Sequence, residues 1–354
     1  MSATTSSAGR LALGPKRVVN RKISDALEIV LPLLATIVVT AAAWAFTPLS
    51  GSFGYFIVTF ALFLVGVYVV ARRAHGKIVG SDRVVTVAIA SAGLLTVGPL
   101  ILILIFVAAK GIGGISAGFF TKTLEGLSPD AAATAGGAKH AIIGTLMQVG
   151  VASFVAVPFG VLTAVYLHEI NGRLAPAIRV IVDAMSGLPS IVAGLFVYAI
   201  FVVGRGYSGL AAALALSILM LPTVARTSEE MLKLVDPGLR ESSLALGAPQ
   251  WRTVMQVVLP TARTGIVTAI ILGIARIAGE TAPLLMTAFG NDQVVTVDGV
   301  SKPQSSLPLF IYQQITNANR STVTRGWVGA FVLILLVLTL FTIARIIGRP
   351  RKMR

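Results

Sequence analysis

Long apolar runs, separated by short polar segments, dominate the chain. Each run is close to the roughly 20 residues that a helix needs to cross about 30 Å of hydrocarbon. Lipid offers the backbone no hydrogen-bond partners, so each segment must satisfy its own polar groups, which favours helices over strands. The runs lie at residues 29–46, 53–71, 84–109, 141–166, 180–203, 208–225, 264–289 and 327–347. The pattern predicts an all-α polytopic membrane protein with eight transmembrane helices.

Composition supports this class and excludes several kinds of chemistry. The chain is 55% hydrophobic and 12% charged, with a mean hydropathy of +0.87, values that a soluble domain could hardly keep off its surface. It has no cysteine, which excludes disulfides, thiolate metal sites and cysteine nucleophiles. The histidines, His75, His140 and His168, lie too far apart in the sequence to suggest a metal site. Gly76-Lys77 lacks the remainder of a Walker A motif, so ATP hydrolysis by this chain is not expected, and no cofactor is indicated.

The basic residues predict an orientation. The net charge is +15, but with the N-terminus inside, 21 of the 29 lysines and arginines fall in cytoplasmic segments and 7 in external ones. This asymmetry follows the positive-inside rule and places both termini in the cytoplasm of a multi-pass cell-membrane (inner, cytoplasmic membrane) protein. The excess charge is therefore a matter of orientation, with some attraction to anionic lipid, and is not a nucleic-acid footprint.

The stretch from Asp236 to Pro260 is too polar for a membrane span. Asp236 is suited to cap a helix that begins at Pro237, and Gly247 is suited to end it in the left-handed conformation. Pro249 then opens a second short helix, which Pro260 is expected to close. A solvated loop and a DNA-reading helix-turn-helix are the alternatives, and the apolar runs on both sides weaken both.

Two motifs carry a resemblance to a known family. The pattern of Glu241, Ser242 and Ser243, followed by Gly247 and by Pro260, resembles the "EAA" coupling loop of bacterial ABC importer permeases, with Ser-Ser in place of the usual Ala-Ala. Residues 273–285, GIARIAGETAPLL, resemble the signature of phosphate-specific (Pst) permeases, and Thr-Ala-Pro after Gly-Glu is similar to the PstA-type subunit. The resemblance covers residues 112–347.

The resemblance implies a fold and a division of the chain. The last five helices would form a type I, MetI-like core of the binding-protein-dependent transport inner-membrane family. The implied parts are a basic cytoplasmic tail (1–28), three N-terminal transmembrane helices (29–109), an external loop (110–139), a permease domain (140–347) with a coupling loop (226–263), and a basic cytoplasmic tail (348–354).

The resemblance also implies a function and partners. The chain would be the PstA-type permease of an ATP-driven importer of inorganic phosphate and would perform no covalent chemistry. It would pair with a homologous PstC-type permease, two PstB-type ATPases and an external PstS-type phosphate-binding protein. The implied ATPase-coupling residues are Glu241, Ser242, Ser243, Gly247 and Pro260.

Charged residues within the apolar runs are the candidates for a substrate pathway. Arg276 and Glu280 are four residues apart, on one face of the same predicted helix. A charge at a helix centre costs about 2.5–3.5 kcal/mol, so such residues normally face a partner or a wet cavity. The pair could simply lock helices together, or it could form an anion site in which the guanidinium binds phosphate oxygens and the carboxylate positions it.

A second arginine, Arg226, ends the preceding apolar run. Spacing along the helix suggests Glu230 as its partner, and Asp183 is expected to pair locally with Arg179. Arg226 could be an arginine whose side chain snorkels to the interface, or part of the pathway. The resemblance implies transport roles for both Arg226 and Arg276.

Glycines and one tryptophan predict details of the helices. The sequence Gly187-Leu188-Pro189 is expected to kink its helix. Gly187, Gly194, Gly265 and Gly273 are expected to let helices approach closely. Trp327 is expected to start the last helix at the membrane interface.

Two other classes of function remain open from the residues alone. An ion-coupled secondary anion transporter would also suit intramembrane Arg276 and Glu280, but it would not need the glycine-hinged cytoplasmic loop. In a noncatalytic membrane scaffold, buried charges at helical spacing would be unexpected. Co-purification with an ATPase would separate the importer from both.

Overall fold

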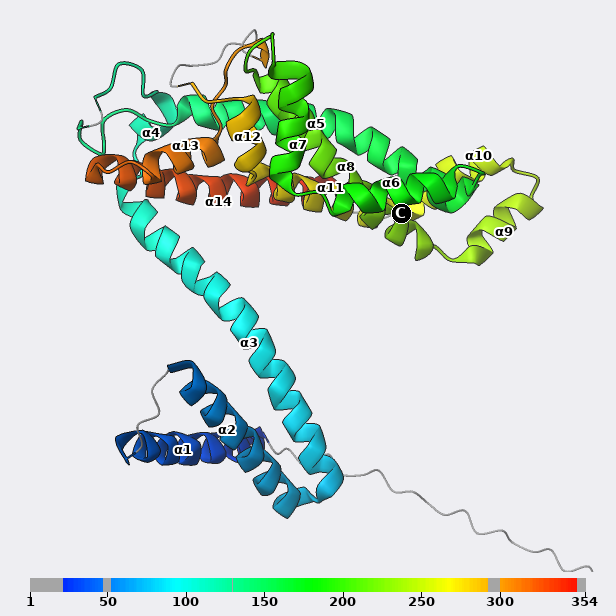
Figure 1. Ribbon diagram of the computed structural model, residues 1–354. Coiled ribbons are helices and arrows are strands. Elements are labelled where there is room, and N and C mark those ends of the chain that lie inside the picture. The colour runs from blue at the N-terminus through cyan, green and yellow to red at the C-terminus, as the bar shows by residue number, and fades with distance from the viewer. Residues whose placement is uncertain (1–21, 47–51, 129, 292–299, 349–354) are drawn as a thin grey trace, which may run out of the picture. The chain divides into compact units, whose positions relative to one another are not determined.

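The computed structural model describes residues 22–46, 52–128, 130–291 and 300–348, and helices dominate it (Figure 1). The long helices are α1 (Lys22–Phe46), α2 (Ser52–His75), α3 (Lys77–Gly111), α5 (Lys139–Val165), α8 (Gly209–Lys233), α11 (Leu259–Ala278) and α14 (Arg320–Gly348). The shorter helices are α4 (Ala117–Thr121), α6 (Ala175–Ser186), α7 (Ser190–Val197), α9 (Pro237–Ala245), α10 (Gln250–Thr253), α12 (Ala282–Thr287) and α13 (Leu307–Ile315). One 3₁₀ turn, Ile112–Gly114, and three π turns, Tyr166–Ile170, Tyr198–Val202 and Val254–Val258, extend or join them. The predicted all-α membrane class is confirmed.

The predicted count of eight spans is not confirmed. Within the described ranges, 6 helices are long and apolar enough to cross a membrane, or 7 if the bent pair formed by α6 and α7 is one span. Helix α1 contributes only a shorter apolar stretch, Ile29–Ala42. The predicted run 180–203 is broken at Gly187-Leu188-Pro189, where the two halves bend by 105°. The proline ring and its missing N–H prevent the helix from continuing, so the predicted kink is a full break.

The chain divides into two compact units, residues 1–103 and 104–354. In the first unit, α1 and α2 pack together. A methyl group added at Gly66 of α2 would lie 3.1 Å from Cβ of Pro32, which shows how closely the two helices approach. Gly76 has a φ of +91°, and this left-handed residue lets the chain turn from α2 into α3.

Helix α8 lies at the centre of the second unit, packed against α5, α6, α7, α11 and α12. In its most apolar stretch 67% is buried, against 33% or less for the other candidate spans. Glycines on two neighbouring helices make this possible. A methyl group added at Gly160 of α5 or at Gly273 of α11 would lie 2.9 Å from Val224 of α8. Small residues therefore set the spacing of this bundle.

The predicted close approaches are confirmed for three of the four glycines. A side chain at Gly194, Gly265 or Gly273 would meet another segment closer than ordinary contact distance, whereas Gly187 lies at the break and faces only its own turn. The last helix begins earlier than predicted, at Arg320 rather than Trp327. The Trp327 ring packs edge-on against Phe106, with ring centroids 5.3 Å apart, so tertiary packing fixes it.

Candidate functional site

Helices α9 and α10 lie together at one end of the second unit, opposite the end that carries α4 and α13 (Figure 1). Oδ1 of Asp236 accepts a hydrogen bond from the N–H of Gly238 at 2.8 Å, and Pro237 stands in the first turn of α9. Gly247 has a φ of +83°, so the predicted cap and left-handed turn are confirmed. The hydroxyls of Ser243 and Thr253 lie 2.8 Å apart and hold α9 against α10.

The predicted end of the second helix at Pro260 is wrong. Helix α10 continues through the π turn Val254–Val258 directly into α11, and Gln250–Ala278 form one candidate span of 29 residues. Pro260 stands in the first turn of α11. A proline inside a helix lacks a donor and its ring crowds the preceding turn, and the wider π turn just before it provides the needed space.

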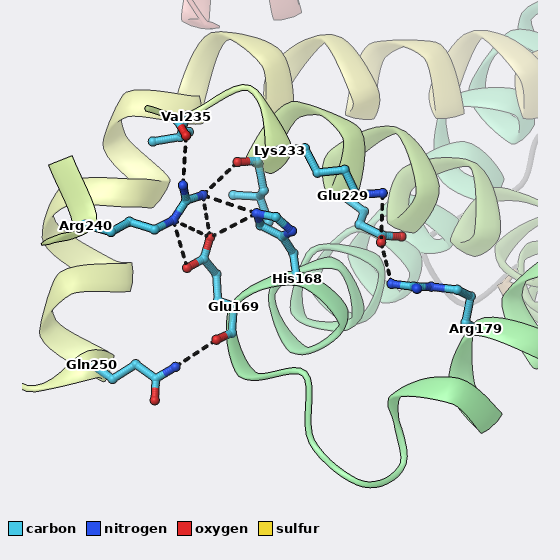
Figure 2. A network of polar contacts seen from close by, with 9 residues as sticks. His168, Glu169, Arg179, Glu229, Lys233, Val235, Arg240 and Gln250 are labelled. Carbon is cyan, nitrogen blue, oxygen red and sulfur yellow. Dashed lines mark hydrogen bonds and ion pairs between the residues drawn. The ribbon is translucent and has the colours of Figure 1, made fainter. Parts of the chain in front are cut away.

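A polar network anchors this hairpin to the π turn Tyr166–Ile170 that follows α5 (Figure 2). Arg240 of α9 donates from Nε to both carboxylate oxygens of Glu169 at 3.2 Å, and from Nη2 to Oε1 at 2.8 Å. Its Nη1 and Nη2 also donate to the carbonyl oxygens of Val235 and Leu232, each at 2.8 Å. Nη2 further approaches Nε2 of His168 at 3.3 Å. One guanidinium therefore ties together α9, the end of α8 and the π turn that follows α5.

The network is partly closed to water and borders a cleft. The side chain of Glu169 is 7% exposed and that of Arg240 is 19% exposed. Gln250 of α10 adds a second link, donating from Nε2 to the carbonyl oxygen of Glu169 at 2.7 Å. The cleft, of about 470 Å³, is lined by His168, Glu169, Arg240, Leu244, Gln250, Thr253 and Val254. Sequence reasoning missed Glu169 and Arg240, because nothing in a single sequence links residues that far apart.

The predicted coupling residues do not all have the same surroundings. Glu241, Ser242 and Gly247 are exposed, whereas Ser243 is partly buried against α10. Near them, large apolar side chains face outward, with Leu246 89% and Trp251 63% exposed. The hairpin therefore presents a mixed polar and apolar surface that no other described part of the chain covers.

The two charges predicted on one helix face do not pair. Helix α11 ends at Ala278, so Glu280 lies beyond its last turn. Among the described residues, no ion pair joins Arg276 to Glu280. Instead, Nη1 of Arg276 donates to Oγ1 of Thr223 on α8 at 2.9 Å. The interpretation of Arg276 and Glu280 as a helix-locking pair is therefore wrong for this structure.

Arg226 also has a partner other than the predicted one. Its Nη1 lies 2.6 Å from Oδ1 of Asp183 on α6, and not against Glu230. Arg179, the predicted partner of Asp183, instead binds Glu229 at 2.8 Å. Both predictions considered neighbours along one segment. Packing of α6 against α8 offers each charge a nearer partner on the other helix.

Thr223 and Arg226 lie three residues apart on α8, so they share one face of that helix. The hydrogen bond from Arg276 to Thr223 therefore brings both arginines to the same side of α8. Arg226 and Arg276 are exposed in the chain taken alone, and Glu280 is partly buried. Two guanidinium groups gathered on an exposed face attract anions and can bind phosphate or carboxylate oxygens in pairs.

Comparisons with known proteins place this architecture in a family. Residues 156–352, more than half of the chain, match the family described as "Binding-protein-dependent transport system inner membrane component". A Mycobacterium tuberculosis (strain CDC 1551 / Oshkosh) protein named "Phosphate transport system permease protein PstA 1" is 44% identical over 246 residues, covering 68% of this chain and 80% of the relative. A Mycobacterium leprae (strain TN) protein named "Phosphate transport system permease protein PstA" is 40% identical over 262 residues, covering 72% and 84%. The Pasteurella multocida (strain Pm70) protein of the same name is 39% identical over 247 residues, covering 69% and 86%. This chain thus belongs to the family of inner-membrane permease components of binding-protein-dependent transport systems, and is a membrane component rather than an enzyme.

Proposed function

We propose that this chain is the permease subunit of an ATP-driven importer of inorganic phosphate. The observation that carries the proposal is the pair of arginines, Arg226 of α8 and Arg276 of α11, because Arg276 binds Thr223 on the face of α8 that carries Arg226. The names of the relatives above, which specify phosphate transport, point to the same substrate. A guanidinium pair suits phosphate because each group offers forked donors that match two phosphate oxygens.

The residues divide into two groups in this proposal. Arg226, Arg276 and Glu280 belong to the phosphate pathway, which a second, PstC-type permease completes. Glu241, Ser242, Ser243 and Gly247 meet a PstB-type ATPase, and Pro260 acts indirectly by holding the wide turn between the coupling loop (226–263) and α11. The permease domain comprises residues 140–347, and a PstS-type protein delivers phosphate from outside. Exposed Leu246 and Trp251 supply the apolar area that a stable interface needs.

The test is reconstitution of the chain with its candidate partners in proteoliposomes. We expect the chain to co-purify with the ATPase and to carry labelled phosphate only with ATP and the phosphate-binding protein. An ion-coupled secondary transporter would instead carry phosphate without the ATPase when an ion gradient is imposed. A scaffold would carry no phosphate under either condition. One set of measurements therefore distinguishes the importer, the ion-coupled transporter and the scaffold.

The proposed orientation places α9 and α10 in the cytoplasm with both termini, and residues 110–139 outside, which requires that α1 and the bent pair of α6 and α7 each cross the membrane. It rests on the excess of basic residues in the cytoplasmic segments. Since the chain has no cysteine, single cysteines can be labelled without background from the chain itself. Cysteine at Ser128 or Ser301 is expected to react with an impermeant thiol reagent in sealed cells, and cysteine at Ser242 only after permeabilisation. Labelling of position 242 in sealed cells would reverse the orientation.

A further inference from the structure

Two ion pairs join α6 to α8, and they differ in how far they are buried within the chain. Arg179 binds Glu229, whose side chain is 2% exposed, and Lys233 approaches the same carboxylate at 3.1 Å (Figure 2). Asp183 and Arg226 lie 2.6 Å apart, with side chains 51% and 49% exposed. Opening the first pair would strand a buried charge, whereas both partners of the second lie at the surface of the chain, where another anion can reach them. The Asp183–Arg226 pair can therefore open while α6 stays fixed on α8.

We propose that Asp183 is the exchangeable counter-ion of Arg226. Its carboxylate binds the guanidinium when the pathway is empty, and a passing phosphate takes its place. Carboxylate and phosphate present similar oxygen acceptors to a guanidinium, so the two compete for the same donors. The inference rests on the proposed function, since it requires that a phosphate reaches Arg226.

The surroundings of the pair favour exchange over permanent closure. Arg276, held by Thr223, adds a second positive charge to the same face of α8. With Asp183 in place, these three side chains keep a net positive charge, which still attracts an anion. Once phosphate binds Arg226, the displaced carboxylate is a negative charge beside it, and repulsion shortens the stay of the phosphate. Asp183 thus satisfies the empty arginine and speeds release.

The first experiment removes the charge and keeps the shape. In proteoliposomes holding the complete complex, Asp183→Asn is expected to lower ATP-driven phosphate uptake roughly fivefold, because phosphate dissociates more slowly from an arginine without its counter-ion. Glu230→Gln is the matched control. Glu230 is exposed and follows Arg226 by one turn of α8, yet Arg226 binds Asp183 instead, so its loss should leave uptake near the wild-type value. Equal uptake by Asp183→Asn and wild type would overturn the proposal.

The second experiment restores the charge chemically. Asp183→Cys modified with a sulfonate-bearing methanethiosulfonate should regain much of the lost uptake, whereas a trimethylammonium-bearing reagent should lower it further. The same reagents on the complex assembled with the wild-type chain, which has no cysteine of its own, give the baseline. Millimolar phosphate should slow the sulfonate reaction, because phosphate and the reagent compete for Arg226. Equal rescue by both reagents, or no effect of phosphate, would contradict the counter-ion role.

A purely structural role for the pair has a different signature. Exchanging the charges, Asp183→Arg with Arg226→Asp, rebuilds an ion pair between α6 and α8 but moves the guanidinium. We expect the double variant to recover thermal stability but not uptake. Full recovery of uptake would show that the pair only holds α6 against α8. If the wild-type complex carries no phosphate, the proposed function fails. If it carries phosphate and Arg226→Gln abolishes uptake while Asp183→Asn does not, only this inference fails.

Discussion

Replacing Arg240 with methionine is expected to loosen the α9–α10 hairpin from the π turn Tyr166–Ile170, where only the Gln250 hydrogen bond remains, and to abolish ATP-driven uptake. The change removes the guanidinium, which donates hydrogen bonds to the Glu169 carboxylate and to the carbonyl oxygens of Val235 and Leu232. The Glu169 side chain, which is 7% exposed in the wild-type chain, then loses its ion pair with Arg240. Breaking a buried pair from one side typically costs about 3–5 kcal/mol. The measurements are ATPase co-purification, thermal stability of the complex and phosphate uptake.

Two further variants make this prediction specific. Arg252→Met removes the same charge from the same hairpin, but Arg252 is exposed and its guanidinium lies over the Trp251 ring at 5.4 Å, so a small effect is expected. The double variant Arg240→Met with Glu169→Met should regain stability, because no unpaired charge remains. Its uptake should recover less, since the Arg240–Glu169 link is still missing and only the Gln250 hydrogen bond to the backbone of residue 169 remains. Normal coupling in Arg240→Met alone would show that the ATPase, and not this network, positions the hairpin.

Local structure around the hairpin could be predicted because it depends on backbone chemistry at single positions. The Asp236 cap and the left-handed Gly247 need only their own residue types, and both are present. The prediction that Pro260 ends a helix is wrong because a proline ends a helix only when the preceding turn cannot widen. The π turn at Val254–Val258 arises from the packing of the helix, and none of its residue types predicts a wider turn.

The sequence identifies the charged residues of the candidate site, but the ion-pair partners predicted from it are wrong. A charge in an apolar run, or at its end, is visible in any sequence, so Arg226, Arg276 and Asp183 could be found without a structure. Their partners depend on which helices touch. Glu229 and Arg179 are 50 residues apart and bind across α6 and α8, whereas spacing rules consider only neighbours three or four residues away. The Glu169–Arg240 link was missed for the same reason.

Arg276→Gln is expected to lower phosphate uptake about ten- to a hundredfold, because a charge-assisted hydrogen bond is typically worth about 1.5–3 kcal/mol. Glutamine keeps some length and a donor for Thr223 but removes the fixed charge and one arm of the fork. Arg276→Lys should restore part of the uptake, since the charge returns without the two-pronged geometry. Labelled-phosphate uptake at matched protein levels, with assembly checked by co-purification, measures both variants.

Glu280 and Thr223 separate a pathway role for Arg276 from a structural one. If Arg276 served to neutralise Glu280, the double variant Arg276→Gln with Glu280→Gln would recover wild-type uptake. No recovery is expected, because α11 ends before Glu280 and, in the part of the chain that the structure describes, the two side chains form no ion pair.

Thr223→Val keeps the shape of the contact and removes the acceptor of the Arg276 hydrogen bond. It should cost uptake far less than Arg276→Gln, since the guanidinium retains its charge and regains water as a partner. Equal losses in the two variants would mean that Arg276 acts by tying α11 to α8, and the anion pathway would then have to lie along another face.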